Sequence, residues 1–95
     1  MATYDVAHIK EQGIDLIIIV VDSSFGLKTP GEQQKMTIAL QECATAAGLA
    51  GTVVPVWDTG ASQIGFFAPT NWRPFFSNID MAFVATNINR ELTCA

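Results

Sequence analysis

The sequence predicts a small α+β domain. We expect a sandwich with a mostly antiparallel sheet of about four strands, in the order ββαββα, and two helices on one face. Residues 16–21 form an unbroken apolar run rich in β-branched side chains, which is typical of a central strand. Residues 29–32 open a stretch with helical apolar spacing, and two apolar segments flank a turn-rich loop at residues 58–62.

Composition limits the class of protein. The 95 residues carry nine acidic and five basic side chains, and the formal charge is -4. Hydrophobic residues make up 49% and charged residues 15%, which excludes a disordered chain because such chains are polar and highly charged. The length predicts one domain over residues 1–95. The lack of a basic stripe predicts no nucleic-acid partner, and the short apolar run predicts no membrane span.

The N-terminal half is predicted as strand, strand, helix. Residues 3–10 favour a strand, which Gln12-Gly13 turns into the central run, and a short helix over residues 6–12 is the alternative. The helix is expected from Pro30 to Ala47. Thr29 can cap it, with Glu32 completing a capping box, and Gly48 supplies a left-handed stop.

The C-terminal half is predicted as a hairpin followed by a second helix. A hairpin symmetric about Gly60 would place Val54 opposite Phe66 and Pro55 opposite Gly65. Pro55 cannot donate to a ladder, so its strand is expected at an edge or with a bulge. Residues 69–76 are expected to form a turn or one helical turn. Helical spacing over residues 78–92 predicts the second helix, and a strand over residues 81–88 is the alternative.

The two cysteines are predicted to be free thiols in a cytoplasmic protein. The first thirteen residues are charged, unlike a secretory signal, and two thiols without an export signal fit a reducing compartment. Cys43 is expected as a small core residue of the helix. Cys94 is expected to be frayed and exposed.

The apolar surplus predicts self-association. Two helices on one face would leave the other face with Val53, Trp57 and Phe67 in water, at a cost of about 1.5–3 kcal/mol each. Large apolar patches mark interfaces, so we expect a homodimer or higher homo-oligomer with these three residues in its interface. The alternative is that residues 72–76 fold over the patch within one chain.

An aromatic cluster predicts a ligand pocket as a second hypothesis. Six large rings fall between residues 57 and 76 and could line an apolar pocket. A carboxylate beside them would suit a lipophilic cation. The candidate ligand-binding residues are Trp57, Asp58, Phe66, Phe67, Trp72 and Phe75.

A third hypothesis is a small enzyme that uses Asp22, Ser23 and His8. Asp22, Ser23 and Ser24 follow the central strand, where ligand sites gather in open α/β sheets. They lack a phosphate-binding or nucleophile-elbow motif, so we expect them to cap their own backbone. His8 has no adjacent nucleophile, and one histidine with two distant cysteines lacks metal-site spacing. We therefore predict no catalytic residue, metal or cofactor, and expect first a non-enzymatic, self-associating binding or accessory protein.

Overall fold

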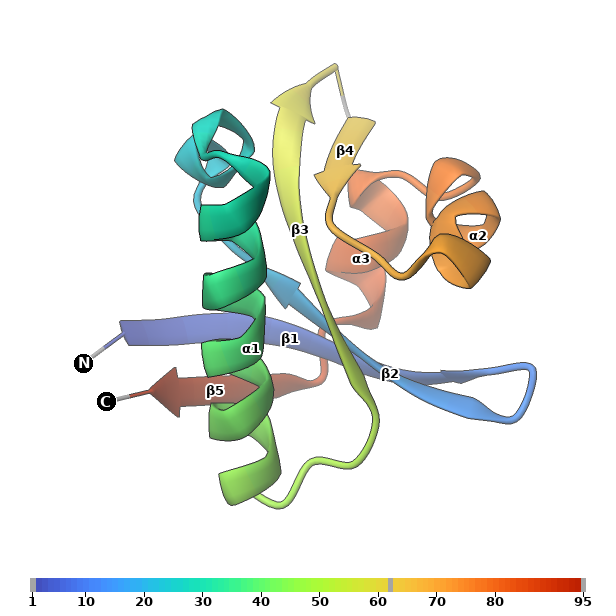
Figure 1. Cartoon of the computed structure of the whole chain (residues 1–95). Coiled ribbons are helices and arrows are strands. Elements are labelled where there is room, and N and C mark those ends of the chain that lie inside the picture. Colours follow the sequence, from blue (N-terminus) through green and yellow to red (C-terminus); the bar gives the residue numbers. More distant parts are fainter. Residues whose placement is uncertain (1, 62, 95) are drawn as a thin grey trace.

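A computed structural model describes residues 2–61 and 63–94 of the chain. Five strands form one mixed sheet in the order β4-β3-β2-β1-β5, with helices on both faces (Figure 1). The α+β class is confirmed, whereas four antiparallel strands with two helices on one face is wrong. The strands are β1 (Ala2–Glu11), β2 (Ile14–Val20), β3 (Thr52–Gly60), β4 (Gln63–Phe66) and β5 (Arg90–Cys94). The helices are η1 (Ser23–Leu27), α1 (Pro30–Ala46), η2 (Thr70–Trp72), α2 (Arg73–Ser77) and α3 (Met81–Asn87).

The unit β2–α1–β3 forms the centre of the fold, and β2 pairs with β3 in parallel. The prediction for α1 is confirmed at both ends. The Thr29 hydroxyl accepts from the Glu32 backbone N–H at 3.2 Å, and the Glu32 carboxylate accepts from the Thr29 N–H at 3.0 Å. Gly48 has a φ of 84°, the left-handed conformation that ends a helix. A parallel pair needs such a crossover, which explains why α1 lies over the sheet.

The N-terminal hairpin is also as predicted. β1 pairs antiparallel with β2, and Gln12 and Gly13 turn the chain with φ values of 51° and 78°. Two positive φ values in a two-residue loop match the right-handed twist of the flanking strands. His8 lies opposite Ile17 in this ladder.

The C-terminal segment departs from the prediction, because α3 ends at Asn87 and β5 follows it. Asp80 caps α3 by accepting from the Phe83 N–H at 2.9 Å, and Ile88 is already extended. Leu92 is the last member of the expected helical stripe. In the structure it pairs with Tyr4 and is 2% exposed, on the face of the sheet that α1 covers. β5 pairs with a strand at the other end of the chain, so no short stretch of sequence predicts this pairing.

Two side-chain amides satisfy strand edges where a neighbouring strand is missing. Asn89 accepts from the His8 backbone N–H and donates to the His8 carbonyl oxygen, both at 2.9 Å. Gln41 accepts from the Val53 N–H at 2.9 Å and donates to the Gly51 carbonyl oxygen at 3.1 Å. Unpaired strand edges invite aggregation, so these amides protect β1 and β3.

The β3–β4 hairpin has a register two residues away from the predicted one, with Trp57 opposite Gly65 and Val56 opposite Phe66. An irregularity between Asp58 and Gly60 absorbs the difference. Side chains alternate with a period of two, so this shift leaves every one on its expected face.

Pro55 lies on β3, which is an interior strand and not an edge. The Pro55 carbonyl oxygen accepts from the Phe67 N–H at 3.1 Å, just beyond the end of β4. The missing donor of Pro55 therefore faces the position where the β4 ladder has stopped. The proline therefore costs a single hydrogen bond at the end of the ladder, and β3 carries an irregularity at Asp58, as the alternative of a bulged strand allowed.

Both faces of the sheet are covered within one chain. Val53 is 2% exposed and packs with Leu40 and Ala44 of α1, and Trp57 and Phe67 are half-buried beside them. η2, α2 and α3 cover the opposite face, with Phe76 and Val84 fully buried. The expected open face is therefore absent. The Trp72–Phe76 segment does fold back over the sheet, but on the face opposite Val53.

The prediction of free thiols is wrong, because Cys43 and Cys94 form a disulfide between α1 and β5. Their Cα atoms lie 5.9 Å apart. Cys94 is not frayed, since β5 pairs with β1 and carries it to the last turns of α1. In the described ranges, no helix combines the length and apolar character needed to cross a bilayer.

Candidate ligand-binding site

The aromatic side chains predicted to share one pocket lie on two faces of the sheet. Trp57 and Phe67 pack on the α1 side, whereas Phe66, Trp72 and Phe75 pack on the side of α2 and α3. Phe66 and Phe67 are consecutive, and consecutive residues of an extended chain point to opposite faces. This alternation was visible in the sequence and already argued against a single pocket.

Trp57 is a packing residue. Its ring centroid lies 5.0 Å from that of Phe25. Its indole fills the space above Gly26 and Gly65, where an added Cβ at either glycine would collide with it. The neighbouring Asp58 is exposed, and its carboxylate accepts from the Gly60 N–H at 2.7 Å. Neither side chain faces the hollow that Trp72 and Phe75 share.

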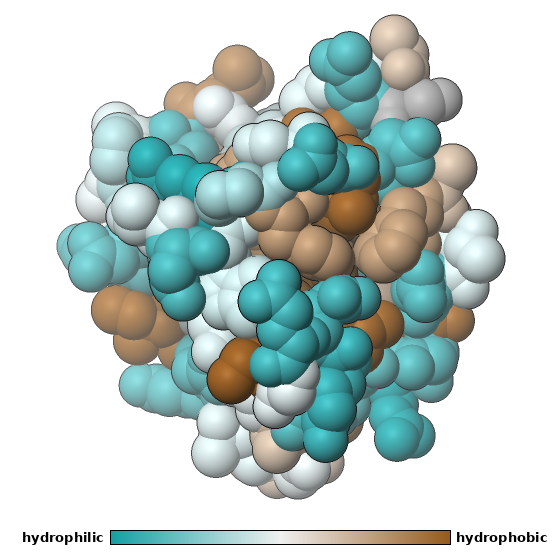
Figure 2. Space-filling model, turned by 90° about the vertical axis from the view of Figure 1, so that its right-hand side faces the viewer, coloured by the Kyte–Doolittle hydropathy of each residue, from teal (hydrophilic) through white to brown (hydrophobic). Residues whose placement is uncertain are grey.

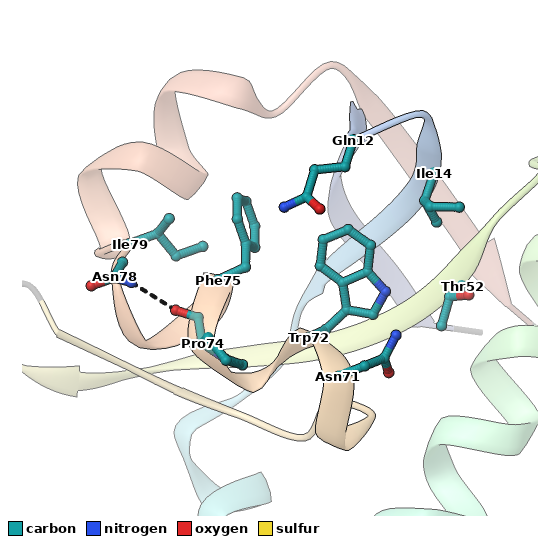
Figure 3. Close-up of a pocket in the computed structure, with 9 residues that line it drawn as sticks. All are labelled: Gln12, Ile14, Thr52, Asn71, Trp72, Pro74, Phe75, Asn78 and Ile79. Atoms are coloured by element: carbon teal, nitrogen blue, oxygen red, sulfur yellow. Dashed lines mark hydrogen bonds between the residues drawn. The ribbon is translucent and has the colours of Figure 1, made fainter.

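Trp72 and Phe75 line an open hollow of about 890 Å³ between the β1–β2 turn and α2 (Figure 3). Figure 2 shows this side of the molecule, where apolar side chains gather toward α2 and α3 and hydrophilic ones frame them. We call this space the amide–aromatic hollow. Its lining residues are Gln12, Ile14, Thr52, Asn71, Trp72, Pro74, Phe75, Asn78 and Ile79.

The aromatic wall is held by a compact turn. The Trp72 N–H donates to the Pro69 carbonyl oxygen at 2.9 Å, and Pro74 occupies the first turn of α2, where no donor is needed. The rings of Trp72 and Phe75 meet edge to face with centroids 5.8 Å apart. Phe75 makes a second edge-to-face contact with Phe76 at 5.1 Å. Such pairs fix ring orientation, so the wall is preformed.

The polar side chains of the hollow are the carboxamides of Gln12, Asn71 and Asn78 and the hydroxyl of Thr52. The Asn78 side chain donates to the Pro74 carbonyl oxygen at 2.9 Å, as the dashed line in Figure 3 marks. The exposed Gln12 and Asn71 side chains remain open to a ligand. Each amide offers both donors and an acceptor. No Asp, Glu, Lys, Arg or His stands among the described lining residues.

Phe66 belongs to a second, smaller hollow on the same side. It shares a space of about 470 Å³ with Phe76, Ile79 and Asp80. The Asp80 side chain caps the N-terminus of α3, where it accepts a hydrogen bond from the backbone. The structure therefore brings together Trp72 and Phe75 of the predicted set, places Phe66 nearby, and leaves Trp57, Asp58 and Phe67 elsewhere.

The loop after β2 has the capping role expected of it. The Asp22 carboxylate accepts from the Ser24 N–H at 2.8 Å, and this hydrogen bond lowers the pKa of Asp22. The Ser23 hydroxyl donates to the Asp58 carbonyl oxygen at 2.9 Å, which ties the loop to β3. These hydrogen bonds engage Asp22 and Ser23 in the fold itself.

His8 is not beside that loop. It lies opposite Ile17, five residues before Asp22, which corresponds to roughly 17 Å along a strand. The His8 Nε2 atom lies 2.8 Å from the Ala50 carbonyl oxygen and so secures the α1–β3 connection. The three residues of the enzyme hypothesis are therefore not assembled into one site.

Sequence reasoning missed the polar half of the hollow. Gln12 was assigned only to a turn, and Asn71 only to the start of a helical turn. The Gln12-Gly13 turn lies at the end of the sheet that α2 reaches. Gln12 therefore comes close to the aromatic wall only in the folded chain. The only local hint was that Asn71 and Asn78 bracket the Trp72–Phe76 aromatic segment.

Comparison with protein-family models, curated proteins and solved structures finds no match to this chain. Within residues 2–61 and 63–94, no three His, Cys, Asp or Glu side chains lie close enough together to hold a metal ion.

Proposed function

We propose that this chain is a non-enzymatic binding protein that holds a small uncharged ligand in the amide–aromatic hollow. The observation that carries this proposal is the pairing of the open Gln12 and Asn71 amides with the aromatic wall of Trp72 and Phe75. Binding sites combine apolar walls with a few polar groups that fix orientation. A planar ring with an amide-like edge meets both requirements.

The lining favours a neutral ligand over the lipophilic cation suggested by the sequence. Desolvating an ion costs much more than desolvating an amide unless an opposite charge compensates it. The described lining offers no such charge, and Asp58 lies near the end of β3, outside the hollow. An uncharged amide edge can instead exchange two hydrogen bonds with a carboxamide side chain.

Three isosteric probes test this proposal: benzamide, benzoate and the benzamidinium cation. Fragments of this size bind in the millimolar range at ordinary ligand efficiency. The two indole N–H signals in a proton–nitrogen NMR spectrum provide the readout, and the variant Trp57→Phe assigns them. Benzamide is expected to shift the Trp72 signal and leave that of Trp57 unchanged, with the two ions at least about tenfold weaker.

Matched variants complete the test. Asn71→Ala and Gln12→Ala should each weaken benzamide binding, since each removes a donor and an acceptor. Gln34→Ala removes an exposed amide from α1 and should change nothing. The proposal is overturned if benzamidinium binds best, if Trp57 is the indole that responds, or if benzamide produces no shift.

Self-association is the second candidate function. Its sequence-based motive, an open face with Val53, Trp57 and Phe67, is lost because α1 covers that face. What favours it now is that β4 and β5 end the sheet on either side, and outer strands can pair with a second copy. Sedimentation equilibrium distinguishes a 10.2 kDa monomer from a species of twice that mass. A cytoplasmic location remains a prediction from the sequence.

A further inference from the structure

The Cys43–Cys94 disulfide lies in a second groove, on the opposite side of the sheet from the amide–aromatic hollow. The groove has a volume of about 940 Å³ and runs between α1 and the outer end of β1 and β5. Both cysteines are half-buried and belong to its lining. Its floor is mainly apolar, with Tyr4, Met36 and Leu40. A thiol can therefore approach the bridge without opening the fold.

The bridge controls an edge strand. β5 is a five-residue strand that pairs on one side only, with β1. Besides that ladder, β5 is held by the burial of Leu92, by a hydrogen bond between the Thr3 and Thr93 hydroxyls, and by the bond from Cys94 to α1. Short edge strands with little buried surface are the segments that open first by local unfolding. Breaking the bridge leaves β5 as such a segment.

The fold can also accommodate the reduced thiol of Cys43. The Cys43 Sγ atom lies 3.6 Å from the Thr93 carbonyl oxygen, so a reduced Cys43 thiol finds an acceptor without moving. A thiol is a weak hydrogen-bond donor, so this contact would not hinder reoxidation of the reduced protein. Both cysteines are half-buried, and their reduced thiols are neutral, so reduction buries no charge.

We infer that Cys43–Cys94 is a thiol–disulfide exchange site whose substrate is a dithiol reductant, and that its reduction loosens β5 from β1. A thiolate of the reductant attacks one sulfur of the bridge, the bond between the two sulfurs breaks, and the displaced cysteine takes up a proton. The second thiol of the reductant then attacks the mixed disulfide. The protein gains two electrons and two protons, and the reductant leaves as its own disulfide.

Exposed disulfides are reduced more easily than buried ones, and they include the labile, regulatory and catalytic bridges. An accessible bridge at a strand edge belongs to that class, whereas a bridge sealed in a core would not. The inference is independent of the ligand proposed for the hollow on the other face.

The first experiment measures how fast dithiothreitol reduces the bridge in the intact protein and in guanidinium. Accessibility predicts a native rate within about tenfold of the denatured rate. Ala46→Phe places a ring in the groove and should slow reduction several-fold, whereas Ala82→Phe, an exposed site on α3, should not. A native rate more than about a thousandfold below the denatured one would mean that global unfolding must precede reduction, and would overturn the inference.

The second experiment compares hydrogen exchange in the oxidised protein, the reduced protein and the Cys94→Ser variant. Residues 2–6 and 90–94 should lose at least about tenfold more protection in the latter two than β2 and β3 do, because the core strands lose only what the lower global stability removes. Equal protection of β5 in all three forms would show that the bridge does not control the strand. Uniform loss across the sheet would show a structural bridge and also refute the inference.

Discussion

Removal of the Cys43–Cys94 bridge tests how much this disulfide contributes to the free energy of unfolding of this small domain. Cys43→Ser, Cys94→Ser and the double variant all break it, and the reduced wild-type chain breaks it without any substitution. Both cysteines are half-buried, so a serine hydroxyl there can still reach water. The four forms should therefore lose nearly the same stability.

The magnitude follows from the length of chain that the bridge closes. The cysteines are 51 residues apart, and the chain-entropy relation for a loop of that length gives about 4 kcal/mol at 25 °C. The bridge acts mainly by restricting the unfolded chain, so little of this figure depends on local contacts. In a domain of this size about 1 kcal/mol corresponds to about 4–8 °C, so the expected fall in Tm is roughly 15–30 °C.

Urea unfolding followed by circular dichroism measures the free energy of unfolding for all forms, and calorimetry gives Tm. Losses of about 2–5 kcal/mol, equal within error among the four forms, would support the reasoning. A loss below about 1 kcal/mol in every form would refute it, because the bridge would then not constrain the unfolded chain. A large loss in the serine variants with a small loss in the reduced protein would assign the effect to the substitutions.

Three further predictions concern packing, edge protection and pH. Gly65→Ala should cost about 1–3 kcal/mol because its Cβ would collide with the Trp57 indole, whereas Gly31→Ala, with open space around it, should be tolerated in the same thermal melts. Asn89→Ala should cost about 1–3 kcal/mol by removing two hydrogen bonds to the backbone of β1, and should speed hydrogen exchange of that strand near His8. The Thr29 backbone N–H lowers the pKa of Glu32 below its ordinary value of 4.5. Wild type should therefore exceed Glu32→Gln in stability at neutral pH, and unfolding curves should converge as the pH falls through that lowered pKa; a constant gap down to pH 3 would contradict this.

The sequence by itself determined the elements whose signals are local. The apolar run of β2 marked a central strand, the Thr29–Glu32 capping box and Gly48 fixed the ends of α1, and Gln12-Gly13 marked the first hairpin. Each of these depends on backbone preferences or on hydrogen bonds between residues a few positions apart. Such interactions are the same in almost any surroundings, so they can be read before the fold is known.

The tertiary structure alone decided the features that join distant segments. The pairing of β5 with β1 turned the end of an expected helix into a strand and brought Cys94 to Cys43, 51 residues away. The same closure put helices on both faces and removed the open face on which self-association was predicted. The β3–β4 register shifted because a local irregularity changed which residues form the turn.

The candidate site divides in the same way. Trp72 and Phe75 could be nominated from the sequence, because large rings close together usually pack together. Gln12 could not be, since it reaches the hollow only because the β1–β2 turn extends to α2, about sixty residues later in the chain. Contacts across such separations depend on which long-range strand pairs win in free energy, and no short window of sequence records that competition.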